Sequence, residues 1–286
     1  MKSIPLGTGQ KLMAQTIKNS DINNHQELSI QVSLSGLSFC ILQRDSNTIS
    51  IIKHIEFEKK LNPFDALDRI KHVFNTEDAL KNNFKSVHVT HVNELSTLVP
   101  KALFNEDNLA DYLKFNSKIL KTDFITFDEI ALNDSVNVYV PYVNINNFIY
   151  DTFGSFTYKH FSTILIENIL AIDKNSESQK VYVHVESNHF EIVILDKGNL
   201  IIYNTFEYSN EEDFMYYLLF TIEQLQLNPE TIKVLFLGQI KKEDPLYKIA
   251  YQYIRHIGFS DKQDSYIYKN KPDSNYSDFT LIKNLS

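Results

Sequence analysis

The chain has 286 residues, enough for two modest domains or one large one with a sizeable core. Its formal net charge is −8 and arginine is scarce, which excludes the basic stripe of a typical nucleic-acid-binding protein. The single cysteine excludes an intramolecular disulfide, the N-terminus has no apolar core of a signal peptide, and no apolar run is long enough to span a membrane. We therefore expect a cytoplasmic protein with no nucleic-acid partner and no membrane insertion.

The first regular pattern follows a polar N-terminal segment, residues 1–26. Apolar residues alternate with polar ones over residues 28–57, and polar turns interrupt them twice. Period-two alternation of this kind predicts three half-buried antiparallel strands in a meander. Asn-Pro at 62–63, followed by apolar residues at helical spacing, predicts a helix, and residues 86–92 predict a strand.

The middle of the chain is less regular. Helices are predicted over residues 106–115, 146–153 and 163–172, and a strand over 136–140. Polar residues 173–179 have the composition of a linker. We therefore divide the chain into the N-terminal segment 1–26, a first lobe with an insertion at 27–178, and a second lobe with a C-terminal tail at 179–286.

The second lobe repeats the plan of the first. Val181, Val183 and Val185 alternate with polar residues and begin a second three-stranded meander. A capping box at Ser209 and Glu212 predicts the start of the next helix. A nearly all-apolar strand, a helix after Asp-Pro and a late strand-like run follow, over residues 232–237, 245–254 and 279–282. Each half therefore predicts the order β-β-β-α-β-α.

This order, present twice, resembles the ribonuclease H-like fold as it is duplicated in actin-like ATPases. The chain is also similar to an uncharacterised bacterial family, a domain of unknown function with a degenerate actin-like fold. Segments such as Thr-Leu-Val-Pro at 97–100 and Tyr-Leu-Lys-Phe-Asn at 112–116 resemble that family, and the similarity covers nearly all of residues 27–285. The resemblance implies an α/β protein of two lobes, each with a mixed sheet.

The resemblance also indicates where a nucleotide would bind. Actin-like ATPases place an Asp-x-Gly loop between the first two strands of each half, where it holds hydrated Mg²⁺ and the phosphates. The first such turn here has Gly36 but no aspartate, and the second has Glu186 but no glycine. The paired glycines of the adenosine motif are reduced to Gly238. If the cleft is retained, these three residues are the nucleotide-binding candidates, but we expect no ATP hydrolysis and no catalytic residue.

Metal sites have little support in the sequence. His88 and His91 are three residues apart on a predicted strand, so they point to opposite faces. His184 and His189 could approach across their turn, but no cysteine or aspartate completes a ligand set. We therefore expect no metal and no resident cofactor, with Mg-ATP as the alternative ligand.

Two functions follow from these patterns. The first is a non-catalytic actin-like scaffold or protein-interaction protein, a pseudo-ATPase with a protein partner or self-association. The alternative is a divergent Mg-nucleotide-binding ATPase or phosphotransferase that uses Glu186 as its metal-side carboxylate.

Overall fold

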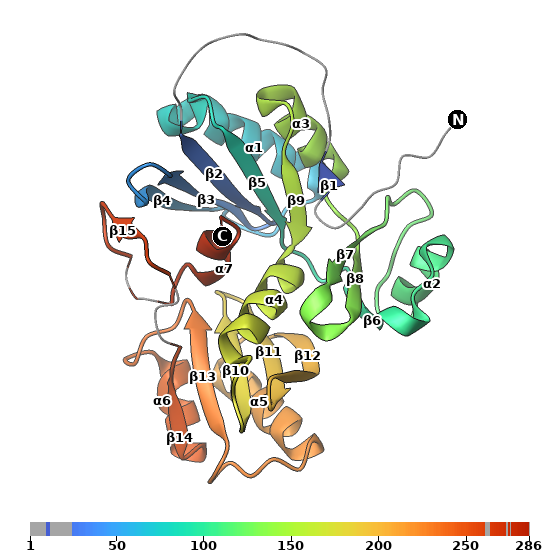
Figure 1. Ribbon diagram of the computed structural model, residues 1–286, viewed down its shortest axis with the longest axis vertical. Coiled ribbons are helices and arrows are strands. Elements are labelled where there is room, and N and C mark those ends of the chain that lie inside the picture. The colour runs from blue at the N-terminus through green and yellow to red at the C-terminus, as the bar shows by residue number, and fades with distance from the viewer. Residues whose placement is uncertain (1–9, 12–24, 261–263, 273, 275, 286) are drawn as a thin grey trace. The chain divides into compact units, whose positions relative to one another are not determined.

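The computed structural model describes residues 10–11, 25–260, 264–272, 274 and 276–285. Most of the polar segment 1–26 lies outside the described residues. The chain forms two compact units, which Figure 1 shows and which are described one at a time. Unit 1 holds residues 1–165, 265–270 and 280–286, and unit 2 holds residues 166–264 and 271–279.

Unit 1 is built on a seven-stranded mixed sheet with the order β1-β9-β5-β2-β3-β4-β15. Its strands are β1 (Gln10–Lys11), β2 (Gln26–Val32), β3 (Gly36–Gln43), β4 (Thr48–Glu56), β5 (Ser86–His91), β9 (Thr157–His160) and β15 (Ile267–Tyr268). Strands β2 to β4 are the predicted antiparallel meander, while β5 and β9 continue the sheet in parallel.

Two helices, α1 (Pro63–Thr76) and α3 (Val143–Phe153), cover one face of this sheet. The period-two pattern places Ile30 of β2 and Phe39 of β3 on that face, where both are fully buried. As predicted, Asn62 begins α1: its side-chain oxygen accepts hydrogen bonds from the amides of Phe64 and Asp65, each at 3.0 Å.

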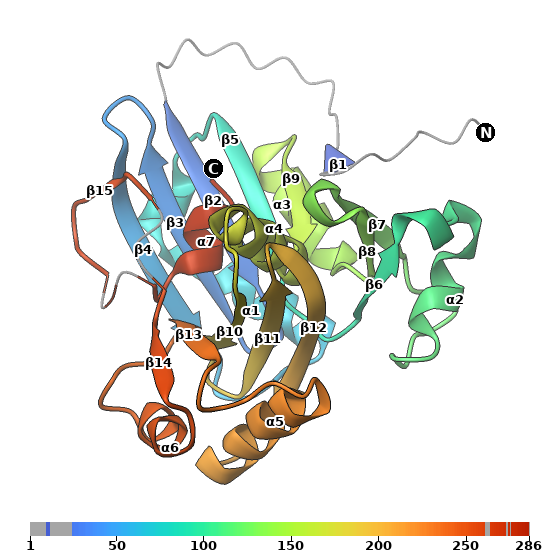
Figure 2. The same ribbon diagram turned by 60° about the horizontal axis from the view of Figure 1, so that its bottom comes forward.

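The C-terminal segment corrects one expectation, because residues 279–282 form a helix, α7 (Phe279–Lys283), and not a strand. Helical spacing lets Leu281 and Leu285 share one side, and both pack with Cys40 on the sheet face opposite α1 (Figure 2). The backbone of α7 is fixed there by the hydroxyl of Ser29, which donates to the carbonyl of Leu281 at 2.7 Å. Residues 280–285 therefore belong to the core of unit 1.

The insertion in unit 1 lies between β5 and α3. It is a three-stranded antiparallel sheet with the order β6-β8-β7, formed by β6 (Ser96–Pro100), β7 (Thr126–Ile130) and β8 (Ser135–Tyr139). The helix predicted over 106–115 is shorter: α2 (Leu109–Leu113) follows a 3-10 turn at Glu106–Asn108. Leu113 of α2 is buried against Val136 and Val138 of the sheet.

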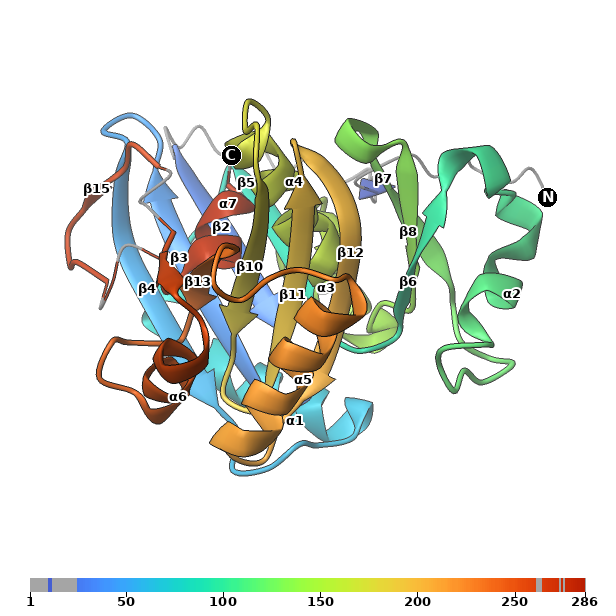
Figure 3. The ribbon, with the colours of Figure 1, turned by 90° about the horizontal axis from the view of Figure 1, so that it is seen from below.

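Unit 2 repeats the plan on a five-stranded sheet with the order β12-β11-β10-β13-β14. Its strands are β10 (Gln179–Val185), β11 (His189–Asp196), β12 (Asn199–Glu207), β13 (Lys233–Gly238) and β14 (His256–Phe259). Its helices are α5 (Glu211–Gln224) and α6 (Pro245–Tyr253), and α4 (Phe161–Asp173) begins in unit 1 and ends in unit 2. Figure 3 shows α5 along one face of the sheet, where it covers the buried side chains of β10 and β11.

The start of α5 differs from the predicted capping box by one residue. The cap is Asn210, whose side chain accepts from the amide of Asp213 at 2.8 Å, and the amide of Ser209 donates back to the Asp213 carboxylate at 3.1 Å. The predicted order β-β-β-α-β-α is confirmed in both units, and a further parallel strand follows its last helix in each, β9 in unit 1 and β14 in unit 2.

Candidate functional site

The turn between β10 and β11 is the candidate site of unit 2. Strand β10 pairs in parallel with β13, and this register sets Val185 opposite Gly238. Glu186 follows Val185 directly, so the structure brings together two of the three residues that the sequence indicated. The third, Gly36, belongs to unit 1 and is described by itself.

Gly238 is required by the close approach of two strands. It has a φ of 79°, and a Cβ atom there would collide with the backbone of Val185 and lie 3.1 Å from the ring of His184. Its amide donates to the carbonyl of Tyr276 at 2.9 Å, and the next amide, of Gln239, donates to Val185 at 2.7 Å. Packing of β13 against β10 therefore accounts for the glycine.

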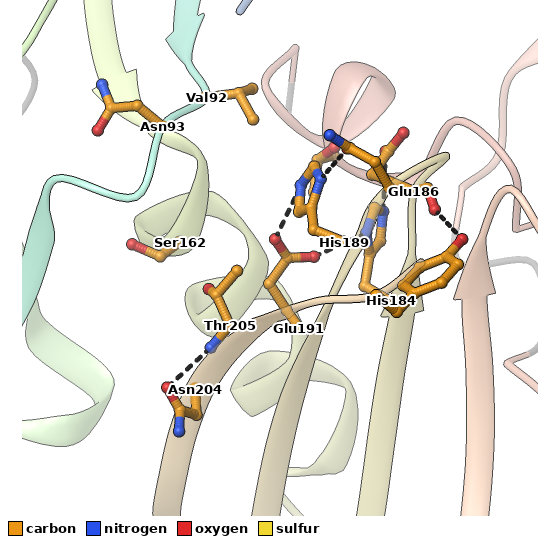
Figure 4. Close-up of polar contacts among 12 residues, drawn as sticks. Val92, Asn93, Ser162, His184, Glu186, His189, Glu191, Asn204 and Thr205 are labelled. Carbon is orange, nitrogen blue, oxygen red and sulfur yellow. Dashed lines mark hydrogen bonds and ion pairs between the residues drawn. The ribbon is translucent and has the colours of Figure 1, made fainter. Parts of the chain in front are cut away.

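Three side chains beside this turn contact one another in series: His184, Glu191 and His189 (Figure 4). His184 and Glu191 face each other across β10 and β11, and Nδ1 of His184 donates to the carboxylate at 3.3 Å. The other carboxylate oxygen lies 3.3 Å from Nε2 of His189. The side chains of His184 and Glu191 are only 1% and 3% exposed, so the contact between these two is shielded from water.

Glu191 and His189 carry opposite charges at neutral pH. Burial alone would raise the pKa of Glu191, but the two histidines outweigh it and lower the pKa to about 2. Burial alone would lower the pKa of His189, but the carboxylate of Glu191, helped by Glu186 and Glu207, raises it to about 8. His189 is therefore an imidazolium, which also donates from Nδ1 to Asn188 at 2.8 Å.

The backbone of the turn is closed on itself. The amide of Glu186 donates to the carbonyl of His189 at 2.9 Å, and the amide of Tyr208 donates to Asn188 at 3.1 Å. The hydroxyl of Tyr208 donates to the carbonyl of Glu186 at 2.6 Å. The carboxylate of Glu186 lies 3.9 Å from Nε2 of His184, and its side chain is 17% exposed. The amides of Glu186 and Tyr208 therefore have internal partners at this turn.

The turn between β2 and β3 in unit 1 is closed in a similar way. The amide of Ser33 donates to the carbonyl of Gly36 at 3.0 Å, and the hydroxyl oxygen of Ser33 accepts from the amide of Ser35 at 3.1 Å. A Cβ atom at Gly36 would lie 2.7 Å from the carbonyl oxygen of Ile55 on β4. The close approach of β4 therefore accounts for this glycine too.

His88 and His91 have protein partners. In the described part of the chain, no group of three or more His, Cys, Asp and Glu side chains is arranged to hold a metal ion. Nδ1 of His88 lies 2.9 Å from the hydroxyl of Thr157, and Nε2 of His91 donates to Asn146 at 2.9 Å. These two histidines serve different neighbours, as their opposite faces on the strand predicted.

A buried polar cluster in unit 1 is a feature that the sequence did not reveal. Both oxygens of the Asp128 carboxylate accept hydrogen bonds, one from Tyr139 and the other from Thr163 and the amide of His160. Burial raises the pKa of Asp128 to about 6, although these hydrogen bonds oppose the rise. Nearby, Nδ2 of Asn137 donates to Thr163, while its Oδ1 has no partner among the described residues.

This cluster joins the insertion to the rest of unit 1, because Asp128 and Tyr139 come from β7 and β8 whereas His160 ends β9. Asp128 lies in a stretch without clear periodicity, and only the pairing of β7 with β8 turns it inward. A signal for it was therefore missing from the sequence.

Two solved structures have folds similar to that of this chain. A protein from Bacteroides thetaiotaomicron VPI-5482, described as having an actin-like ATPase fold and unknown function, is 23% identical with a TM-score of 0.74. That match covers 83% of this chain and 91% of the other. A structure of the PilM-PilN type IV pilus biogenesis complex matches with a TM-score of 0.56 at 9% identity, covering 90% of this chain and 96% of that one.

These two likenesses confirm the duplicated actin-like, ribonuclease H-like fold, and at such identities they show the fold alone. No helix in the described residues has the length and apolar character to cross a membrane. No curated protein matches the chain. A family profile does match residues 15–257, most of the chain, and on that basis the chain belongs to the family of proteins of unknown function called DUF3822.

Proposed function

We propose that this protein is a non-catalytic actin-like scaffold of the cytoplasm, which acts by binding a protein partner or a second copy of itself. It keeps the fold without a working ATP site. The observation that carries the proposal is the closed turn between β10 and β11, whose Glu186 amide donates to His189 and whose neighbouring carboxylate, Glu191, is held by two histidines.

The residues present fit a Mg-nucleotide poorly. Hydrated Mg²⁺ needs a carboxylate that is free to accept from its water ligands, and phosphate needs unpaired backbone amides. Both oxygens of Glu191 already face histidines, which leaves Glu186 as the one carboxylate of the turn. Without a metal, the negative charge of Glu186 would repel a phosphate.

The fold itself is compatible with a role as a component of a protein complex. One of the similar structures is that of the PilM-PilN type IV pilus biogenesis complex, so a protein with this fold occurs as a component of a complex. The likeness supports a role in partner binding here and does not identify the partner.

A thermal shift measurement with Mg-ATP and Mg-ADP at millimolar concentration tests the loss of the nucleotide site. A ligand present at about 100 times its dissociation constant stabilises a protein by roughly 2.7 kcal/mol. We expect no shift with either nucleotide. The matched control is Glu186→Gln, which should give the same flat result because Glu186 holds no metal in the proposed state.

A clear shift together with Mg-dependent ATP hydrolysis that Glu186→Gln abolishes would overturn the proposal in favour of the divergent ATPase. Sedimentation velocity over a range of protein concentrations then separates self-association from a need for another protein. Affinity purification with and without Mg-ATP completes the test, because a scaffold should retain its partner equally in both conditions.

A further inference from the structure

Three large apolar side chains stand in water on one loop of the insertion, residues 114–124, which we call the tip loop. Phe115 is 82% exposed, Leu120 64% and Phe124 44%. Figures 1 and 2 both place α2, which leads into the tip loop, on the side of the insertion that faces away from the seven-stranded sheet of unit 1. Exposed apolar side chains gathered in this way indicate an interaction site.

The tip loop is held in shape by its polar residues. The amide of Ser117 donates to Leu113 at 2.8 Å, which continues the end of α2. The carboxylate of Asp123 accepts from the amide of Leu120 at 2.8 Å, and the amide of Asp123 donates to the Leu120 carbonyl at 3.1 Å. These hydrogen bonds of Ser117 and Asp123 hold the loop in a defined shape, in which Phe115 and Leu120 face water.

The charges of the tip loop are positive, in contrast to a chain whose formal net charge is −8. Lys114, Lys118 and Lys121 are all exposed. Lys118 and Lys121 form no ion pair within the described part of the chain, and Lys114 pairs with Asp111 at 2.8 Å. Asp123, the single acidic residue of the loop, is occupied by the Leu120 amide. A binding partner that complements the tip loop therefore has a surface that is both anionic and apolar.

We propose that the tip loop docks this protein on the surface of an anionic lipid bilayer. Phe115, Leu120 and Phe124 reach between the headgroups, and the lysines lie among the lipid phosphates. Single apolar side chains that alternate with lysines on an outward loop match a fluid interface, whereas a protein groove receives a contiguous apolar face. This contact is peripheral. It rests on the proposed scaffold function and adds to it, because it would localise the scaffold to the membrane surface.

Flotation with vesicles tests the proposal. The full chain is mixed with vesicles of phosphatidylcholine containing about one third phosphatidylserine, or with phosphatidylcholine alone. We expect the protein to float with the mixed vesicles only, and to be released in about 1 M salt, where charges are screened within roughly 3 Å.

Two variants assign the binding to the tip loop. Exchange of Phe115, Leu120 and Phe124 for alanine should weaken binding at least tenfold, and Lys118→Glu with Lys121→Glu should weaken it by a similar factor. All the changed side chains are exposed, so unfolding by urea should be unaltered. The matched control is Phe64→Ala, since Phe64 is 76% exposed in the same unit but lies outside the tip loop.

Absence of flotation for the unaltered protein would overturn the proposal, as would flotation of the triple alanine variant at the level of Phe64→Ala. Binding to an acidic amphipathic peptide without binding to vesicles would show that the tip loop receives a protein instead. Because no nucleotide enters this experiment, its failure leaves the test of the ATP site unaffected.

Discussion

The carboxylate of Glu191 lies 3.3 Å from Nε2 of His189 and, through its other oxygen, 3.3 Å from Nδ1 of His184. One buried carboxylate thus joins two histidines at the turn where an actin-like ATPase would hold phosphate. Unit 2 therefore has an internal ion pair at this turn, and the stability of the unit should depend on it.

Glu191→Gln should lower the pKa of His189 from about 8, because the variant loses the main partner of the imidazolium while burial still disfavours its charge. Removing one partner of a buried ion pair costs about 3 kcal/mol. Titration of the histidine ring signals by NMR measures the first effect, and urea unfolding at neutral pH measures the second. Glu211→Gln, at an exposed position, is the control and should change neither. A His189 pKa that stays near 8 in the variant would contradict the assignment.

The same pair predicts how stability varies with pH. The pKa of Glu191 is depressed from 4.5 to about 2, so its contribution is complete above pH 4.5 and is lost as pH falls toward 2. The pKa of His189 is raised from 6.5 to about 8, so its contribution is complete below pH 6.5 and is lost as pH rises through 8. Urea unfolding across this range should show the pair's stabilisation greatest between pH 4.5 and 6.5. Glu191→Gln should reduce the loss of stability at both the acidic and the alkaline end of this range.

The pKa of Asp128 in unit 1 is shifted in the opposite direction to that of Glu191. Its pKa is raised from 3.8 to about 6, so the folded state binds the proton more tightly and stability from this group is lost as pH rises through 6. The loss amounts to about 3 kcal/mol. Asp128→Asn keeps a polar side chain in the cluster without a charge and should remove this dependence. Unfolding of the variant at pH 4 and pH 7 measures it, with exposed Asp134→Asn as the control. An equal pH dependence in both variants would count against a buried, titrating Asp128.

The fold could be predicted from the sequence where local pattern and final environment agree. Alternation at Leu28 and at Val181 marked both meanders, and Asn62 marked the start of α1, because one face of each element is buried. Residues 279–282 were mispredicted since a short apolar run fits a strand or a helix, and only the sheet face around Cys40 decides between them. The capping residue of α5 was misplaced by one position because Ser209 and Asn210 are both good caps.

The site could be predicted only in part. The sequence located Glu186 and Gly238 by comparison with a fold, and pairing of β10 with β13 does bring them together. The role of Glu191 could not be predicted, because its contacts depend on the register between β10 and β11. A shift of one residue would turn its side chain to the other face of the sheet. The exposed Phe115 and Leu120 likewise resemble core residues in the sequence.

Gly238→Ala tests whether the glycine serves packing. Gly238 and Gly154 share a φ of 79°, but a Cβ atom at Gly154 would meet nothing within 4 Å, whereas one at Gly238 would collide with Val185. Both variants place alanine at positive φ and carry backbone strain, and only Gly238→Ala adds the collision. We expect Gly238→Ala to be less stable than Gly154→Ala by about 1 to 3 kcal/mol in urea unfolding. Equal losses would mean that β13 can move away from β10 at no cost.

The C-terminal helix should contribute to the stability of unit 1 as any core element does. Leu281 is 2% exposed and packs with Cys40 and Leu285, so Leu281→Ala should cost about 2 to 5 kcal/mol by leaving a cavity. Leu132→Ala is the matched control in the same unit, since Leu132 is 55% exposed and its truncation should change the free energy of unfolding by less than about 0.5 kcal/mol. Urea unfolding of the two variants measures the contrast. Protection of the Ser29 and Cys40 amides from hydrogen exchange adds a local reading, because α7 covers that face of the sheet. If Leu281→Ala were as stable as Leu132→Ala, α7 would be an appendage and the core of unit 1 would end at its sheet.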